Sequence, residues 1–251
     1  MKRVSGIIIT TVITAFIAVI GYLVIDYRLG RAGHNPLEKE DPFVVKYLAK
    51  EFVLEPGAEF WKDIKPVRVH LYPQSARVPH GTLERELLVR AAHNGREIAF
   101  LLEFKDGTED RGAPVNPDAC AILFVPNPAP ATAQMMGYAS KANVWQWLAD
   151  RDAERFQRGD ESIKAVRELI ASGPGTQTPL KDQNVDGKGQ YRDGMWSVVF
   201  KRPLKSQQEG EFEFEPGVDK KIAFALWDGT RMESFSRKSI AILRTLRLEK
   251  P

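Results

Sequence analysis

The sequence predicts a mainly β protein: a single antiparallel β-sandwich with helical and loop insertions, preceded by one N-terminal transmembrane helix. Three observations indicate this fold class. From Pro66 onward, short apolar runs that alternate with period two recur between turn signals. The pair Asn94-Gly95 separates two of these runs, as in a tight β-hairpin. At the N-terminus, a long uncharged run follows two basic residues.

The uncharged run extends from Val4 to Ile25, directly after Lys2 and Arg3. Its length matches the roughly 20 apolar residues that a helix needs to cross a bilayer. A cleaved signal peptide is the alternative, but such peptides end in small residues, whereas this run ends in the bulky "YLVI". We therefore predict a single-pass anchor over residues 1–27 in the cytoplasmic membrane, with the remainder on the extracytoplasmic, periplasmic side.

The rest of the chain divides into a stalk and one domain. Residues 28–42 are polar and rich in helix breakers, and residues 43–251 supply the sandwich. Non-strand structure is expected in "FVVKYLAKEF" (one or two helical turns), "MGYASKANVWQW" (a glycine-punctuated loop), "DAERFQRGDESIKAVRELIASG" (a helix ending at Gly173) and "GPGTQTPLKDQNVDGKGQYRDG" (a long Gly-rich loop). Strands are expected in "VRVHLYP", on both sides of Asn94-Gly95, and in "DACAILFVP", "GMWSVVFKRPL", "KKIAFALWDGT" and "IAILRTLRLE".

Composition excludes several classes of protein. The net charge of the 251 residues is only +3, and basic residues alternate with acidic ones, so no nucleic-acid-binding stripe is present. The single cysteine, Cys120, excludes an intrachain disulfide, an iron–sulfur cluster and covalently attached haem. The four histidines lie too far apart in the sequence for a zinc motif. Hydrolase and transferase motifs are also absent from the sequence.

The remaining candidates for chemistry are a methionine pair and one lysine. Met135 and Met136 stand before a glycine, and two tryptophans follow within a dozen residues. A thioether is a soft metal ligand, but methionines also fill cores, and tryptophans serve as core, as pocket wall or as a sugar-binding platform. Lys238, in "SFSRKSIAIL", would by itself be a solvated charge. Residue pattern alone therefore leaves the function open.

Five segments, in order between Phe60 and Leu248, point to a known family. They are "AAHNGREIAFLLEFKDGTED", "DACAILFVP", "MGYASKANVWQWLAD", "DGMWSVVFKRPL" and "IAFALWDG" with the "RKS" that follows. Together they resemble the haem b-binding γ subunits of periplasmic molybdenum enzymes of the dimethyl sulfoxide reductase family. That family includes ethylbenzene dehydrogenase, dimethyl sulfide dehydrogenase, selenate and chlorate reductases, and nitrite oxidoreductase.

The resemblance implies one non-covalent haem b per chain, with its iron held between a methionine and a lysine. The methionine before glycine is Met136, with Met135 as second choice, and the lysine of the K-S pair is Lys238. A lysine ligates iron only as the free amine, and its ordinary pKa is about 10.4, so burial and coordination must displace the proton. Further residues expected to contact the haem are Gly137 and Trp145, with Arg202 and Arg237 as the expected partners of its propionates.

The implied function is electron transfer without catalysis. The subunit would pass electrons between the iron–sulfur β subunit of a molybdenum oxidoreductase complex, whose α subunit holds molybdopterin, and an external soluble or membrane carrier such as cytochrome c. The predicted anchor favours a nitrite oxidoreductase or nitrate reductase type of complex. One alternative is a cofactor-free tethered β-sandwich that binds carbohydrate or acts as an assembly scaffold. Another is a haem domain that works alone as a redox carrier.

Overall fold

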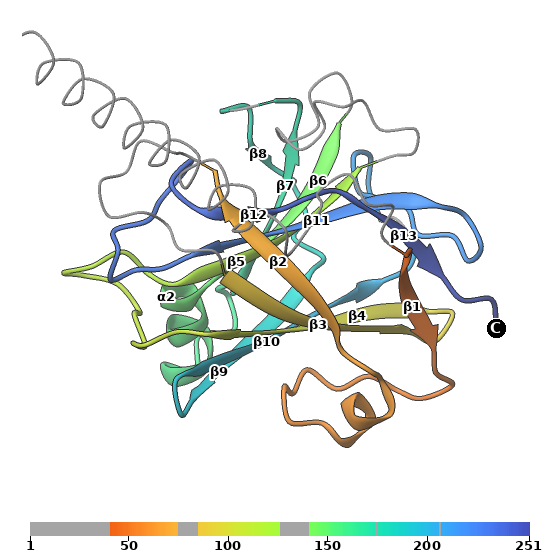
Figure 1. Cartoon of the computed structure of the whole chain (residues 1–251), viewed down its shortest axis with the longest axis horizontal. Helices are drawn as coiled ribbons and strands as arrows, with labels where there is room; N and C mark the ends of the chain where they lie inside the picture. Colours follow the sequence, from red (N-terminus) through yellow and green to blue (C-terminus); the bar gives the residue numbers. More distant parts are fainter. Residues whose placement is uncertain (1–40, 75–84, 126–140, 174, 206) are drawn as a thin grey trace, which may run out of the picture. The chain divides into compact units, whose positions relative to one another are not determined.

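Strands make up most of the domain, and nearly all of them pair in antiparallel fashion (Figure 1). The computed structural model describes residues 41–74, 85–125, 141–173, 175–205 and 207–251. The strands are β1 (Phe43–Tyr47), β2 (Val67–Pro73), β3 (Arg85–His93), β4 (Glu97–Lys105), β5 (Ala119–Val125), β6 (Ala142–Leu148), β7 (Val166–Ala171), β8 (Thr178–Pro179), β9 (Asp186–Arg192), β10 (Met195–Pro203), β11 (Lys220–Trp227), β12 (Ser239–Ala241) and β13 (Arg244–Leu248). The predicted mainly β, antiparallel architecture is confirmed.

The sheet follows the order β8-β7-β6-β5-β11-β12-β2-β3-β4-β10-β9, and its two halves pack against each other through one aromatic core. The rings of Phe100 on β4 and Trp145 on β6 lie 5.9 Å apart, and those of Trp147 on β6 and Trp196 on β10 lie 4.9 Å apart. Such offset and edge-on ring pairs add to the free energy that their burial contributes. These contacts make β5, β6 and β11 one layer and β3, β4 and β10 the other.

The hairpin predicted at Asn94-Gly95 is confirmed between β3 and β4. The side-chain oxygen of Asn94 accepts hydrogen bonds from the backbone N–H groups of Arg96 at 2.9 Å and Glu97 at 2.8 Å. Gly95 has φ of +84°, in the left-handed region that glycine adopts without steric cost. The turn therefore depends on both residues, which is why the dipeptide predicts it.

The helical turns expected in "FVVKYLAKEF" were a wrong prediction, because this segment contains strand β1. Its burial alternates, with Phe43 and Val45 buried and Val44 between them exposed. β1 pairs in parallel with β13 and with β3, so it fills a gap between two other strands. Long-range pairing thus overrides the weak local pattern of a five-residue strand.

The helix expected from "DAERF" to Gly173 is also largely wrong. Helical backbone is limited to α2 (Ala149–Asp152) and a π-helical turn at Ala153–Gln157, and strand β7 occupies the second half of the segment. The expected loop before it, "MGYASKANVWQW", contains strand β6 instead. β6 and β7 are neighbours in the sheet, so each supplies the backbone partner that makes the other a strand.

The long Gly-rich loop expected after Gly173 includes two strands, β8 and β9. The glycines of β9 face the core, where a side chain would not fit. A Cβ on Gly189 would lie 2.2 Å from a ring atom of Trp147, and one on Gly187 would lie 2.3 Å from Val166. These glycines therefore allow close packing against a large indole and do not mark a loop.

The predicted membrane anchor, residues 1–27, and most of the stalk lie outside the described residues. Within the described ranges, no helix is both long enough and apolar enough to cross a membrane.

A buried ion pair crosses the core between β7 and β10. The guanidinium of Arg202 donates to Glu168 at 3.0 Å, and neither side chain has any exposed area. The same guanidinium donates to the carbonyl of Phe212 and lies over the rings of Trp145 and Phe214. Burial raises the pKa of the Glu168 carboxyl, and the charge of Arg202 opposes that rise.

Removing one partner of this pair should strongly destabilise the domain. We expect Arg202→Met to lower the free energy of unfolding by about 3–5 kcal/mol, because it leaves the Glu168 carboxylate buried without its counter-charge. The double variant Arg202→Met/Glu168→Leu should recover most of that loss. Chemical denaturation of the three proteins checks this, and equal losses in the single and double variants would contradict it.

Candidate functional site

One face of the layer formed by β5, β6 and β11 points away from the aromatic core and carries unusually small side chains. On β5 and β11 this face presents four alanines, namely Ala119, Ala121, Ala223 and Ala225. Side chains alternate along a strand, so the large residues between these alanines point into the core. Ala121 and Ala225 are direct cross-strand partners, while Ala223 lies opposite Leu123 and Ala119 opposite Trp227, so the alanines form a low floor bordered by taller side chains.

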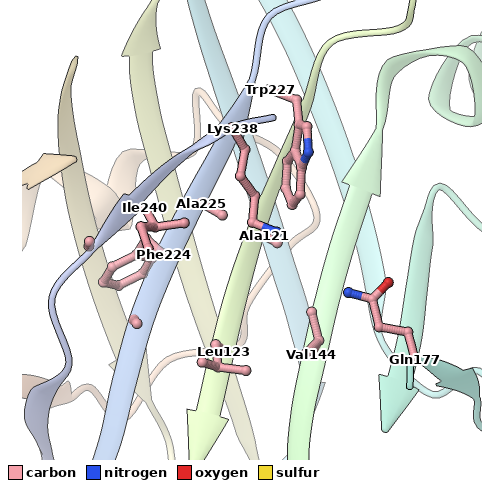
Figure 2. A pocket seen from close by; sticks show the side chains of 11 residues that line it. Ala121, Leu123, Val144, Gln177, Phe224, Ala225, Trp227, Lys238 and Ile240 are labelled. Atoms are coloured by element: carbon pink, nitrogen blue, oxygen red, sulfur yellow. The ribbon is translucent and has the colours of Figure 1, made fainter. Parts of the chain in front are cut away.

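Taller side chains rise around this floor and border a hollow, with about 430 Å³ of empty space when the adjoining open solvent is included. Trp227 and Lys238 stand side by side, Ile240 lies at another edge, and Leu123 and Val144 lie further along the sheet (Figure 2). The remaining lining residues are Gln177, Phe224 and Ala241. Apart from Gln177 and Lys238, the lining is apolar, so the hollow suits a ligand with a large apolar surface.

Lys238 is the only charged side chain that lines the hollow among the described residues. It immediately precedes β12, and only 4% of the residue is exposed. Figure 2 shows its side chain extended beside Trp227, and its Nζ lies 5.0 Å from the centroid of that ring. The amine donates a hydrogen bond to the carbonyl oxygen of Phe235 at 3.1 Å. In the described part of the chain, no carboxylate forms an ion pair with it.

This environment changes the protonation of the amine. Burial lowers the pKa of Lys238 from 10.5 to about 8, because the apolar surroundings disfavour the charged form. The Phe235 carbonyl and the Trp227 ring favour the ammonium form, but neither carries a full negative charge. Lys238 can therefore supply a neutral amine near physiological pH, which an exposed lysine cannot do.

The loop that carries Lys238 is held in a strained conformation. The carbonyl of Phe235 accepts both the Lys238 amine and the indole N–H of Trp227, the latter at 3.2 Å. Phe235 itself has φ of +50°, an uncommon value for a non-glycine residue, and Met232 has φ of +55°. Strain of this kind persists only where surrounding contacts fix the backbone, and it is concentrated at functional sites.

A group of buried and half-buried aspartates fixes the start of the same loop. Carboxylate oxygens of Asp106, Asp118 and Asp228 lie within 4.8 Å of one another. Asp118 accepts hydrogen bonds from the Trp196 indole and the Gly229 backbone N–H, both at 2.9 Å. Burial, together with the charge of Asp118, raises the pKa of Asp106 to about 7. The group ties the W-D-G turn after β11 to the core. The W-D-G motif stands out in the sequence, but the aspartate group that holds it is not visible there.

The residues predicted from the sequence occupy different environments. Met135, Met136 and Gly137 lie outside the described residues, and Lys238 lines the hollow. Trp145 and Arg202 contact each other inside the core, on the opposite side of the sheet from the hollow. Arg237 is exposed, and it donates to the carbonyl of Arg231 at 3.2 Å. Lys238 and the previously unassigned Trp227 are thus brought together, whereas Trp145, Arg202 and Arg237 do not line the hollow.

The buried amine should make the stability of the domain depend on pH. Between pH 8 and 10.5, the unfolded chain keeps a proton on Lys238 that the folded chain has lost. The free energy of unfolding should therefore rise with pH across this window, by up to about 3 kcal/mol, and this contribution disappears as the pH falls to 8. Lys238→Met should flatten the rise, while Lys181→Met, at an exposed lysine, should not. Chemical denaturation at several pH values checks this, and parallel curves for all three proteins would contradict it.

The fold is similar to that of known β proteins. A family 9 carbohydrate-binding module from Caldicellulosiruptor kristjanssonii, solved with glucose, superimposes with a TM-score of 0.51 over 84% of this chain and 97% of that module, at 10% identity. A protein from Bacteroides uniformis, assigned as carbohydrate-binding, gives a TM-score of 0.53 over 83% and 99% of the two chains, at 12% identity. At these identities the similarity concerns the fold alone.

Sequence comparison identifies the family. A family model described as ethylbenzene dehydrogenase matches residues 58–178 and 172–239. The ORF7 protein of Haloferax mediterranei, assigned as a respiratory nitrate reductase haem subunit, is 31% identical over 79% of this chain and 69% of its own length. The γ subunit of dimethylsulfide dehydrogenase from Rhodovulum sulfidophilum is 30% identical over 63% and 58% of the two chains. The chlorate reductase γ subunit of Ideonella dechloratans is 25% identical over 74% and 76%.

Two of these relatives are named as γ subunits, one of a dehydrogenase and one of a reductase, and the third is named as a haem subunit, which agrees with the resemblance seen in the five sequence segments. The family match spans the strands that form the alanine floor, the turn after β11 and Lys238 itself. The chain therefore belongs to the ethylbenzene dehydrogenase family of γ-type subunits.

Proposed function

We propose that this chain is a non-catalytic, haem-binding electron-transfer subunit of a multi-subunit molybdenum oxidoreductase. The observation that carries the proposal is the amine of Lys238, which is buried over an apolar floor and has no carboxylate partner among the described residues. Burying a lysine without a counter-charge costs free energy, and a group perturbed in this way is a candidate for a ligand or a reactive amine. The names of the relatives, which include haem and γ subunits, support the same assignment.

The residues of the hollow fit a haem in both shape and chemistry. A porphyrin is flat and largely apolar, and the small alanine side chains would leave room for it beside an apolar surface. Lys238 supplies a nitrogen donor whose proton is easily displaced at a pKa of about 8. The bound cofactor would supply reversible one-electron transfer at iron. The protein would contribute the ligands, the apolar surroundings and the exclusion of water.

We assign Met136 as the second axial ligand, with Met135 as second choice. Both lie outside the described residues, so this assignment rests on the family resemblance and on chain connectivity. β5 and β6 both line the hollow, and residues 126–141 connect them. Met136 precedes the first residue of β6, Ala142, by six positions. An extended chain covers at most about 3.5 Å per residue, so Met136 is within reach of the hollow.

A methionine and a lysine together would fill both axial positions of the iron. Substrate would then have no open coordination site, which is the property expected of an electron carrier and not of a catalyst. Thioether ligation favours the ferrous state and raises the reduction potential. We therefore assign one non-covalent haem b to each chain, and the chemical reaction to another subunit.

The complex we propose contains an iron–sulfur β subunit that exchanges electrons with this haem and an α subunit that holds molybdopterin. The outer electron partner is a soluble or membrane carrier such as cytochrome c. Residues 1–27 would anchor the chain in the cytoplasmic membrane with the haem domain on the periplasmic side. The relative from Haloferax mediterranei favours a nitrate reductase type of complex, with the nitrite oxidoreductase type next.

The alternative function is a cofactor-free binding module, either for carbohydrate or for assembly. The fold similarity to carbohydrate-binding proteins does not favour it over the haem subunit, since that similarity concerns architecture alone. The two functions differ in what they require of Lys238. A haem subunit needs a buried neutral amine, whereas a sugar site has no use for one.

Spectra of the ligand variants test the proposed function. We expect the purified protein, reconstituted with haem and reduced with dithionite, to show a sharp Soret band and resolved α and β bands of a low-spin six-coordinate haem. Met136→Ala and Lys238→Ala should each convert it to a high-spin spectrum or lose the haem. Two matched controls should keep the wild-type spectrum: Met195→Ala, which changes a methionine on β10, and Lys181→Ala, which changes an exposed lysine.

Two outcomes would count against this assignment. A folded wild-type protein without haem bands would favour the cofactor-free module. A low-spin spectrum that survives both ligand substitutions but is lost on replacing His34 or His80 would mean that the axial pair is wrong.

Filling the alanine floor should exclude the haem without unfolding the protein. Ala225 lies at the centre of the floor, so in Ala225→Phe the ring would occupy the hollow. We expect haem affinity to fall roughly tenfold or more, while Ala225→Ser, a much smaller change, should bind nearly as the wild type does. Haem titration followed by absorption measures both affinities. Wild-type affinity in Ala225→Phe would place the cofactor elsewhere.

A further inference from the structure

A second and larger cavity adjoins the hollow and differs from it in polarity. It measures about 1520 Å³, including space open to solvent, and shares Trp227 and Gln177 with the hollow. Its lining includes the polar side chains of Gln74, Asn116, Gln146, Arg167 and Glu233. A ligand that extends from the hollow into this cavity would therefore pass from apolar to polar surroundings.

The register of the strands places Arg167 in line with the alanine floor. Across the sheet, Ala225 on β11 pairs with Ala121 on β5, Ala121 with Gln146 on β6, and Gln146 with Arg167 on β7. Residues paired in this way share one face of the sheet. Three strand spacings separate Ala225 from Arg167, or about 14 Å at ~4.8 Å each. Arg167 thus lies at the end of the floor away from Ile240, the partner of Ala225 on β12.

The guanidinium of Arg167 is available to bind a ligand. Among the described residues it forms neither an ion pair nor a side-chain hydrogen bond, although the residue is half-buried. The one carboxylate in the cavity, Glu233, is engaged elsewhere: Arg85 lies 3.3 Å from it, and the backbone N–H of Asp228 donates to it at 2.9 Å. By contrast, Arg202 is fully committed to Glu168 inside the core. Arg167 is therefore a cationic group on this face that can bind an anionic ligand.

We infer that Arg167, with Gln146 beside it, binds the propionate carboxylates of the haem. The inference rests on the proposed haem-binding function and adds an orientation to it. The alanines would contact the apolar body of the macrocycle, and Arg167 on β7 would hold the edge that carries both carboxylates. A guanidinium pairs with a carboxylate in bidentate geometry, and a neighbouring amide can donate a further hydrogen bond. Arg167 is then a positioning residue that fixes how the haem is turned within the site.

A comparison of haem with its dimethyl ester tests this inference, because esterification removes both carboxylate charges and leaves the macrocycle unchanged. We expect the wild-type protein to bind haem roughly tenfold to a hundredfold more tightly than the ester. In Arg167→Leu, haem affinity should fall to that of the ester, while ester affinity should not change. Arg167→Lys should recover part of the difference. Arg158→Leu, which removes an exposed arginine, should behave as the wild type does.

The outcomes separate this inference from the proposed function. Low-spin spectra in Arg167→Leu would show that the axial ligands are intact, as expected of a positioning residue. Equal binding of haem and ester by the wild type, or equal weakening of both by Arg167→Leu, would overturn the role of Arg167 and leave the haem subunit standing. A folded wild-type protein that binds neither compound would overturn both proposals.

Discussion

Burial of both faces of β5 and β11 is the constraint on which the rest of the site depends. The inner faces carry large side chains such as Phe124 and Phe224, which fill the space between the layers. The outer faces carry alanines that are almost fully buried as well. Because side chains alternate strictly along a strand, the sequence can place a dense core and a low apolar floor back to back on the same strands. The core fixes the floor, since neither strand can shift its register without exposing aromatic rings.

The position of Lys238 follows from this arrangement and from the loop that leads to it. Asp118 holds the turn after β11 through Trp196 and Gly229, and the Phe235 carbonyl holds both Trp227 and the lysine amine. The amine is therefore placed over the floor by contacts on two sides. Its lowered pKa is a consequence of that placement, because desolvation and not a neighbouring charge causes it. A protein that must offer a neutral nitrogen to a metal gains from this, as the proton no longer competes strongly for the lone pair.

Fold similarity and family membership carry different information about the chemistry of the chain. Similar architecture occurs in carbohydrate-binding proteins at 10% and 12% identity, so the strand framework does not specify a ligand. The family match includes the floor, the W-D-G turn and Lys238, and these are the features that give this face its chemistry. A common β framework can therefore carry different chemistry on its outer face.

The sequence by itself determined the fold class, most of the strands and the candidate lysine. Alternation and the Asn94-Gly95 turn are local signals, and a motif of the family marks Lys238 without any knowledge of the fold. Only the tertiary structure decided the rest. β1 is a strand because distant strands pair with it, and Gly189 belongs to a strand because it packs against an indole. Likewise, strand register decides which face a residue joins, so Arg202 lies in the core and Arg167 lies in line with the floor. Such pairings join residues far apart in the chain, and no local pattern encodes them.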